Sequence, residues 1–204
     1  MFLRNRYPLW VRLVTMLGAI SLFILAYQWG NQLQRRHAEP PVITGLLIQP
    51  PAKLPDFALR DSLGRPFDQD SLTKGWTLLA FGDLARASGQ LAVQRLIDVY
   101  NRAADARALR TQLRLVLIQT SEAPQLARDF ASLLPALQVL AGEPDTIARL
   151  REALGLGASE SPALFVLGPG GRLLAFLGED QDGTSMTEDL KAIHASAFVL
   201  IPEE

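Results

Sequence analysis

Three apolar runs of strand length, each followed by a helical segment, constrain the fold of this chain more than any other feature. The runs cover residues 76–81, 113–118 and 137–140, and the segments after them carry helix-start residues or helical apolar spacing. Strands joined through a helix lie parallel, the crossover is right-handed, and the helices cover the faces of the sheet. The alternation therefore predicts a three-layer α/β/α domain with a parallel centre.

Turn signals on either side of this region add two hairpins to the prediction. Gly168-Pro169-Gly170-Gly171 separates two apolar runs, and Asp61-Ser62-Leu63-Gly64 separates two shorter segments. Glycine and proline in such connections favour turns between antiparallel strands. The expected order is a hairpin over 55–67, strand 76–81, helix 88–106, strand 113–118, helix 121–134, strand 137–140, helix 143–155, strands 163–167 and 172–177, and helix 186–197. The later hairpin is expected to supply antiparallel strands at the edge of the sheet.

Residues 1–30 predict a single transmembrane anchor. The segment from Leu13 to Trp29 carries no charged side chain, and aromatic residues that suit membrane interfaces lie at both ends: Tyr7, Trp10, Tyr27 and Trp29. Arginines precede the segment at positions 4, 6 and 12 and follow it at positions 35 and 36. This bias favours a cytoplasmic N-terminus and a periplasmic domain at the bacterial inner membrane.

Two other interpretations of this segment stay open. A cleaved signal peptide would need a small-residue cleavage site, and His37-Ala38-Glu39 matches one poorly. A buried core helix is the other interpretation. An uncleaved signal anchor accounts best for the length of the apolar run.

A polar and then proline-rich segment follows the predicted anchor. Residues 31–39 are polar, and Pro40, Pro41, Pro50 and Pro51 favour an extended chain. We therefore expect a periplasmic tether over residues 31–54 that adds nothing to a core, followed by one domain over residues 55–204.

The composition excludes several classes of chemistry. The chain has no cysteine, which rules out disulfides, thiol catalysis and thiolate metal sites. Its 20 basic and 21 acidic residues give a net charge of −1, whereas nucleic-acid binding needs a basic face. We therefore expect no nucleic-acid partner and no thiol chemistry.

Four sequence segments of the predicted domain match the motifs of one known family in their order and spacing. Leu54–Phe67 is similar to P-x-F-x-L-x-D-x-x-G-x-x-F, and Asp70–Gly82 is similar to L-x-G-K-W-x-L-L-F-F-G. Ala141–Ile147 is similar to T-G-x-x-x-x-I, and Leu164–Leu173 to an apolar residue followed by Y-L-I-D-P-x-G-R-L. Over about residues 45–195 the chain thus resembles the Sco/SenC family, membrane-anchored copper proteins of cytochrome c oxidase assembly. The resemblance implies a thioredoxin-like fold with the N-terminal hairpin of the peroxiredoxin, TlpA and Sco branches.

The departures from this family fall on its metal-binding residues. Where the family has C-x-x-x-C, the chain has Arg86 and Gln90, and Glu160 stands where the family has its histidine ligand. Copper(I) prefers soft thiolate or thioether ligands, which these side chains do not supply. The resemblance therefore implies a degenerate member without the copper site, and we expect no metal and no other cofactor.

Two features near this loop each allow two interpretations. Ser161-Pro162 resembles the cis-proline segment that lies against the redox loop of thioredoxins, or it is a proline that simply begins a strand. Asp83 and Arg86 either form an ion pair that holds the loop in place of a metal, or are ordinary exposed charges. The second interpretation of the charges is favoured.

Other residues that often carry chemistry have ordinary explanations in this sequence. His37 and His194 lie far apart without a ligand pattern, so both are expected to be structural or solvated. The glycines of residues 168–171 precede a strand rather than a helix, and the acidic turn at residues 179–183 lacks the spacing of an EF-hand. No catalytic residue is predicted, and the chain is not expected to be an enzyme.

These inferences predict a membrane-tethered, non-catalytic binding or scaffolding factor. By resemblance its setting is the assembly of respiratory cytochrome oxidase, with an oxidase subunit or a copper-bearing Sco protein as partner. The expected contact residues surround the former metal loop: Asp83, Leu84, Arg86, Gln90, Glu160 and Pro162. Two alternatives stay open, namely a redox-related or other enzyme that acts with a partner's cysteines, and a structural envelope protein unrelated to respiration.

Overall fold

The computed structural model describes residues 9–37, 40–121, 123–132, 135–156 and 162–200. The chain divides into two compact units, residues 1–39 and residues 40–204. Among the described residues, the first unit contains one helix, and the second contains the sheet and the remaining helices.

The helix of the first unit is α1 (Leu9–His37). Its described apolar side chains between Trp10 and Tyr27 are exposed, for example Leu22 and Phe23 by 72% each. Over the part of the chain that the structure describes, no helix combines the length and the apolar character needed to cross a membrane. The anchor segment is therefore helical, and its insertion into a membrane stays a prediction.

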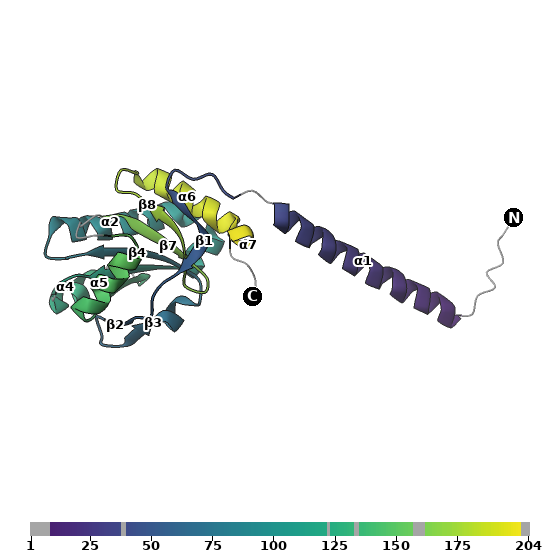
Figure 1. Cartoon of the computed structure of the whole chain (residues 1–204), viewed down its shortest axis with the longest axis horizontal. Coiled ribbons are helices and arrows are strands. Elements are labelled where there is room, and N and C mark those ends of the chain that lie inside the picture. The colour runs from purple at the N-terminus through teal and green to yellow at the C-terminus, as the bar shows by residue number, and fades with distance from the viewer. Residues whose placement is uncertain (1–8, 38–39, 122, 133–134, 157–161, 201–204) are drawn as a thin grey trace. The chain divides into compact units, whose positions relative to one another are not determined.

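The second unit is built on a mixed sheet with the strand order β1-β8-β7-β4-β5-β6-β2-β3 (Figure 1). The neighbours β4, β5 and β6 run parallel, and every other neighbouring pair is antiparallel. The strands are β1 (Leu46–Lys53), β2 (Ala58–Asp61), β3 (Pro66–Asp68), β4 (Trp76–Gly82), β5 (Leu113–Gln119), β6 (Leu137–Ala141), β7 (Leu164–Gly168) and β8 (Arg172–Leu177). The predicted α/β fold with a parallel centre is confirmed.

Helices cover both faces of this sheet. One face carries α2 (Ala87–Arg102), α3 (Arg107–Gln112), α4 (Pro124–Ala131), α6 (Gly183–Ala195) and α7 (Ala197–Leu200). On that face α2 and α6 lie side by side (Figure 1). The other face packs against α5 (Pro144–Ala153), the 3-10 helix η1 (Gln69–Leu72) and the hairpin of β2 and β3. Each face has its own apolar core, which explains why every residue of β4 is buried.

β1 lies within the segment that the sequence predicts as a tether. It pairs antiparallel with β8, and the register shifts between Leu47 and Ala52. Leu54, directly after the strand, is buried in the core. The prediction that this whole segment adds nothing to the core is therefore wrong. Pro50 and Pro51 are tolerated because they fall in the irregular part of an edge strand, where a missing N–H need not interrupt the ladder.

The helix after β4 and the late hairpin also differ in detail from the prediction. The helix expected over residues 88–106 is divided into α2 and the 3-10 helix η2 (Ala103–Asp105), and α3 follows. In α2, Leu91 is 41% exposed, whereas Val93 and Val99 are buried. The hairpin of β7 and β8 is not at an edge, because β1 covers β8. The succession of β4, a short loop and α2 is as predicted.

Candidate functional site

The loop between β4 and α2 spans residues 83–86 and is folded tightly against the first turns of α2. A Cβ on Gly82 would lie 2.6 Å from the Cα of Gly89, and a Cβ on Gly89 would overlap the Asp83 carbonyl group. Arg86 N donates to Asp83 O at 2.9 Å, which closes the turn. The absence of side chains at both glycines therefore allows the loop and the helix to approach this closely.

Asp83 holds this loop through its side chain. Its Oδ1 accepts hydrogen bonds from Ala85 N at 2.9 Å and from Ser121 Oγ at 2.5 Å. Its Oδ2 lies 3.4 Å from Arg86 Nε. Because Ser121 follows β5, the carboxylate joins the connections that leave two neighbouring parallel strands.

These contacts lower the pKa of Asp83 below its ordinary value. The hydrogen bond from Ser121 is the largest cause, and the Ala85 N–H acts in the same direction. Burial opposes them, and the charge of Arg86 adds a smaller lowering of the pKa. Since the donors favour the ionised form, Asp83 is a carboxylate at neutral pH and acts here as a hydrogen-bond acceptor.

The structure decides between the two interpretations of Asp83 and Arg86. The two side chains form an ion pair, and Asp83 is only 9% exposed, so the favoured interpretation as ordinary exposed charges is wrong for Asp83. The side chain of Arg86 is 66% exposed, and ion pairs with an exposed partner contribute little. The hydrogen bonds of Asp83 to Ala85 and Ser121 therefore do most to hold the loop.

The other predicted contact residues differ in their exposure. Gln90 is exposed on the first turn of α2, and its Nε2 donates to Leu84 O at 3.2 Å. The side chain of Leu84 is completely buried in the core beside α2, and Pro162 is buried just before β7. Glu160 and the peptide bond before Pro162 lie outside the described residues. Arg86 and Gln90 thus supply the exposed part of the predicted contact surface, and Leu84 does not.

Solved structures share this arrangement of strands and helices. Copper-bound ScoI from Arabidopsis thaliana has a TM-score of 0.61 at 18% identity, over 71% of this chain and 99% of that chain. Apo Sco1 from Thermus thermophilus has a TM-score of 0.60 at 19% identity, over 76% of this chain and 99% of that chain. The chain has a thioredoxin-like fold similar to that of Sco proteins. The expected thioredoxin-like class is therefore confirmed.

A more distant comparison supports the same fold class. The thioredoxin domain of a thiol-disulfide oxidoreductase from Bacteroides vulgatus has a TM-score of 0.54 at 12% identity, over 71% of this chain and 96% of that chain. No family model and no curated protein matches the sequence. The similarity to Sco proteins is thus one of fold.

The loop at residues 83–86 does not fit the copper of the copper-bound Sco structures. It and the first turn of α2 offer the carboxylate of Asp83, the guanidinium of Arg86 and the amide of Gln90, and none of these is a soft ligand for copper(I). Arg86 also brings a positive charge, which opposes cation binding. Over the described residues, no three histidine, cysteine, aspartate or glutamate side chains gather as metal ligands would. We assign no metal chemistry to this loop.

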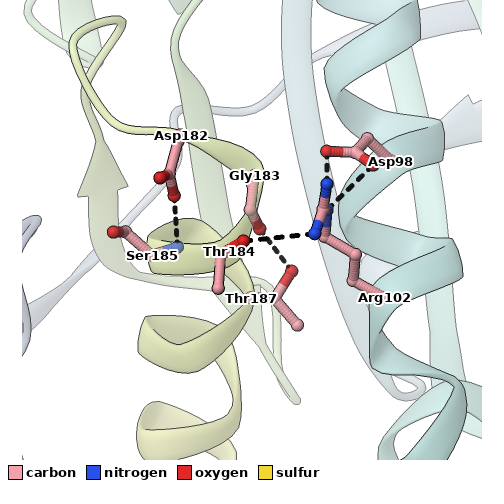
Figure 2. Close-up of polar contacts among 7 residues, drawn as sticks. All are labelled: Asp98, Arg102, Asp182, Gly183, Thr184, Ser185 and Thr187. Atoms are coloured by element: carbon pink, nitrogen blue, oxygen red, sulfur yellow. Dashed lines mark hydrogen bonds and ion pairs between the residues drawn. The ribbon is translucent and has the colours of Figure 1, made fainter.

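The acidic turn before α6 serves the start of that helix (Figure 2). Asp182 Oδ1 accepts a hydrogen bond from Ser185 N at 2.7 Å, as an N-cap residue does. Nearby, Arg102 Nε of α2 donates to both carboxylate oxygens of Asp98 at 2.9 Å, and its Nη1 donates to Thr184 Oγ1 at 3.1 Å (Figure 2). The turn therefore has a structural role at the contact between α2 and α6.

His194 has the structural role expected of it. Its ring lies 5.2 Å from the ring of Trp76, at an interplanar angle of 61°. Burial lowers the pKa of His194 below its ordinary value, so the ring is neutral at pH 7. His37 lies near the end of α1, and its side chain is outside the described part of the structure.

A pocket of about 710 Å³ lies next to Ser121, between the connections after β5 and β6 and the helix α5. Neither the pocket nor the contact of Ser121 with Asp83 follows from the sequence. Ser121 resembles a helix-start residue, but the N-cap of α4 is Ala123, which makes no side-chain cap. The function of Ser121 emerges only when the ends of β4 and β5 are brought together.

Proposed function

We propose that this protein is a membrane-tethered, non-catalytic binding factor in the assembly of respiratory cytochrome oxidase. Its client is an oxidase subunit or a copper-bearing Sco protein. The proposal is supported by a fold similar to that of Sco proteins in a chain that has no cysteine. Because function depends on the site rather than on the fold, the loss of thiol chemistry removes one function without removing a binding surface.

The observation that carries this proposal is the way the loop at residues 83–86 is held. Asp83, Ala85 and Ser121 fix its shape through hydrogen bonds, and the chain has no cysteine for a disulfide. Arg86 is exposed on this fixed loop, and Gln90 is exposed next to it on the first turn of α2. A preorganised surface loses little conformational freedom on binding, which favours a role in recognition.

The membrane tether is proposed on the character of α1. Between Leu13 and Tyr27 the helix carries no charged side chain, and its described side chains are exposed. A helix that is apolar on all sides is stable when protein or lipid covers it. The proposed anchor includes this stretch and covers residues 1–30. It lies in a bacterial inner membrane, with the N-terminus in the cytoplasm and the domain in the periplasm.

The test is affinity capture of the tagged full-length chain from gently solubilised membranes of aerobically grown native cells, with partners identified by mass spectrometry. We expect enrichment of oxidase subunits or of their assembly factors. The double variant Arg86→Ala/Gln90→Ala should lower their recovery at least about fivefold, because it removes the long exposed side chains of the loop and of the first turn of α2.

The control is the double variant Arg107→Ala/Gln112→Ala. It removes the same two residue types from exposed positions on α3, at the opposite end of β5 from the loop. Equal recovery with the two double variants would refute the docking surface. Capture of partners with no link to respiration would refute the oxidase setting and favour a structural role in the envelope.

A further inference from the structure

The pocket of about 710 Å³ lies where the connections of the sheet change sides. β5 is followed by α4 on one face, whereas β6 is followed by α5 on the opposite face. Connections that diverge after neighbouring parallel strands open a crevice beyond the strand ends, and α/β proteins bind ligands at such points. Residues that follow both strands line the pocket.

The walls of the pocket suit a compact apolar group. Ile147 and Leu156 contribute apolar surface and are both buried in the core on the α5 side of the sheet. Gly142 and Ala148 line the same pocket and are too small to fill it. Its volume lies within the range of about 300–1,000 Å³ that small-molecule sites occupy.

Among the described residues, one buried polar side chain at this pocket has no hydrogen-bond partner for its donor. Gln119 lines it, is only 2% exposed, and has no hydrogen-bond partner for its Nε2 among the described residues. A buried donor without an acceptor is costly, and an oxygen of a ligand would remove that cost. Arg151 lines the pocket and supplies a positive charge, while Glu152 is exposed at its rim, where solvent screens the negative charge.

We propose that this pocket binds a small molecule with an apolar body and a carboxylate group. The apolar body packs on Ile147 and Leu156. One carboxylate oxygen accepts a hydrogen bond from Gln119 Nε2, and Arg151 balances the charge. This site is independent of the proposed role in oxidase assembly, because it uses neither α1 nor the exposed residues of the loop after β4.

The test is a ligand-observed fluorine NMR titration of the full chain in lipid nanodiscs, with empty nanodiscs as the blank. The probe is 4-(4-fluorophenyl)butyrate, and the comparison is 4-(4-fluorophenyl)butanol, which has the same body without the carboxylate. We expect saturable binding of the butyrate with a Kd below about 1 mM. The alcohol should bind at least about tenfold more weakly.

Two matched variants on α5 test the location. Ala148 lines the pocket and Ala153 does not, and both are exposed. Ala148→Phe fills the pocket and should weaken butyrate binding at least about tenfold, whereas Ala153→Phe should leave it within about twofold. Equal effects of the two variants would overturn the location.

A third variant tests the carboxylate partner. Gln119→Leu keeps the approximate shape of the side chain and removes its donor, so it should weaken butyrate binding about tenfold and leave the alcohol unaffected. If this buried variant does not fold, the two α5 variants still decide. The absence of saturable binding up to about 1 mM, or equal binding of acid and alcohol, would overturn the proposal.

Discussion

At the scale of the residue, Asp83 shows how one ionised side chain can hold a loop at a strand end. Two donors meet its Oδ1, and Arg86 Nε approaches its Oδ2. The carboxylate is nearly buried, so each donor replaces a hydrogen bond that water would otherwise make. Removing the carboxylate charge would leave Ala85 N and Ser121 Oγ with a weaker acceptor.

Replacing Asp83 with Asn should destabilise the domain in a pH-dependent way. The pKa of Asp83 is lowered in the folded chain, so its stabilisation is complete above the unfolded pKa of about 3.9 and is lost as the pH falls through the folded pKa. We expect the Asp83→Asn variant to lose about 1–2 kcal/mol at pH 7, and the difference to shrink below pH ~4. Urea unfolding of the unmodified chain and of the variant, at pH 7 and below pH ~4, measures this difference in the free energy of unfolding. A difference that does not change with pH would show that ionisation of Asp83 does not hold the loop.

Gly89→Ala should destabilise the domain by about 1–3 kcal/mol, because the added methyl group would overlap the Asp83 carbonyl. The matched control is Gly18→Ala in α1, where an added Cβ meets nothing within 4 Å. Thermal unfolding of the two variants beside the unmodified chain measures the effect. If Gly89→Ala unfolds at the same temperature as the control, the close approach of loop and helix is not required.

The sequence predicts the residues of this loop better than their roles. The spacing of three positions offered Arg86 as a partner of Asp83, but two exposed charges were the favoured interpretation. The largest cause of the lowered pKa is Ser121, which lies 38 positions away in sequence and carries no local signal of this contact. The burial of Leu84 could not be predicted either, since a leucine in a loop fits an exposed or a buried position equally well.

At the scale of the element, β1 depends on a contact with α6. Asp189 of α6 is 5% exposed, and its carboxylate accepts hydrogen bonds from Thr44 N at 2.9 Å and Gly45 N at 2.8 Å. Gln181 Nε2 donates to the same carboxylate at 2.8 Å. Three donors from two parts of the chain thus converge on one buried acceptor and fix the entry to the edge strand.

Asp189→Ala should release β1 from the sheet before the rest of the domain unfolds. It leaves the N–H groups of Thr44 and Gly45 without their acceptor, which should cost about 2–4 kcal/mol. Hydrogen exchange of the amides in β1 should accelerate by at least about tenfold, while amides of β4 change less. Glu188→Ala removes a neighbouring exposed acid from α6 and should change neither. Equal acceleration in β1 and β4 would refute a local role for Asp189.

Elements with a single strong pattern were predictable, and β1 was not. β4 and β5 are mostly apolar because both faces of the sheet are covered, and their predicted bounds differ from the observed ones by one residue at the C-terminal end. In β1 the residues Gln49, Pro50 and Pro51 interrupt any strand pattern. Its place is set by pairing with β8 and by Asp189, which are contacts between distant parts of the chain.

At the scale of the whole molecule, the two units differ in whether their apolar side chains are buried or exposed. The unit over residues 40–204 buries two apolar cores on the two faces of its sheet. α1 instead exposes apolar side chains such as Leu17, Leu22 and Phe23. An apolar surface of this kind on a single helix requires a cover, which we propose to be lipid.

The tether proposal predicts that the full chain stays with membranes during alkaline extraction. The triple variant Leu17→Lys/Ile20→Lys/Phe23→Lys should move most of the chain to the soluble fraction, because each lysine costs about 2.5–3.5 kcal/mol near the middle of a membrane helix. The matched control is Arg107→Lys/Arg110→Lys/Arg149→Lys. It also introduces three lysines, but it keeps the charge of the domain and should stay with membranes. Protease added outside spheroplasts should digest the domain. Extraction of the unmodified chain by alkali, or protection of the domain from protease, would contradict the tether or its orientation.

Because hydrogen bonds of Asp83 fix the loop, the shape of the loop does not depend on redox potential. A loop closed by a carboxylate, a hydroxyl and a backbone N–H contains no thiol or disulfide that could be oxidised or reduced, so a change of redox potential does not break these contacts. A partner that docks on Arg86 and Gln90 would therefore meet one fixed surface at every cellular redox potential. Any dependence of this binding on redox potential would then come from the partner, and on the side of this chain the amount of protein would set the extent of binding.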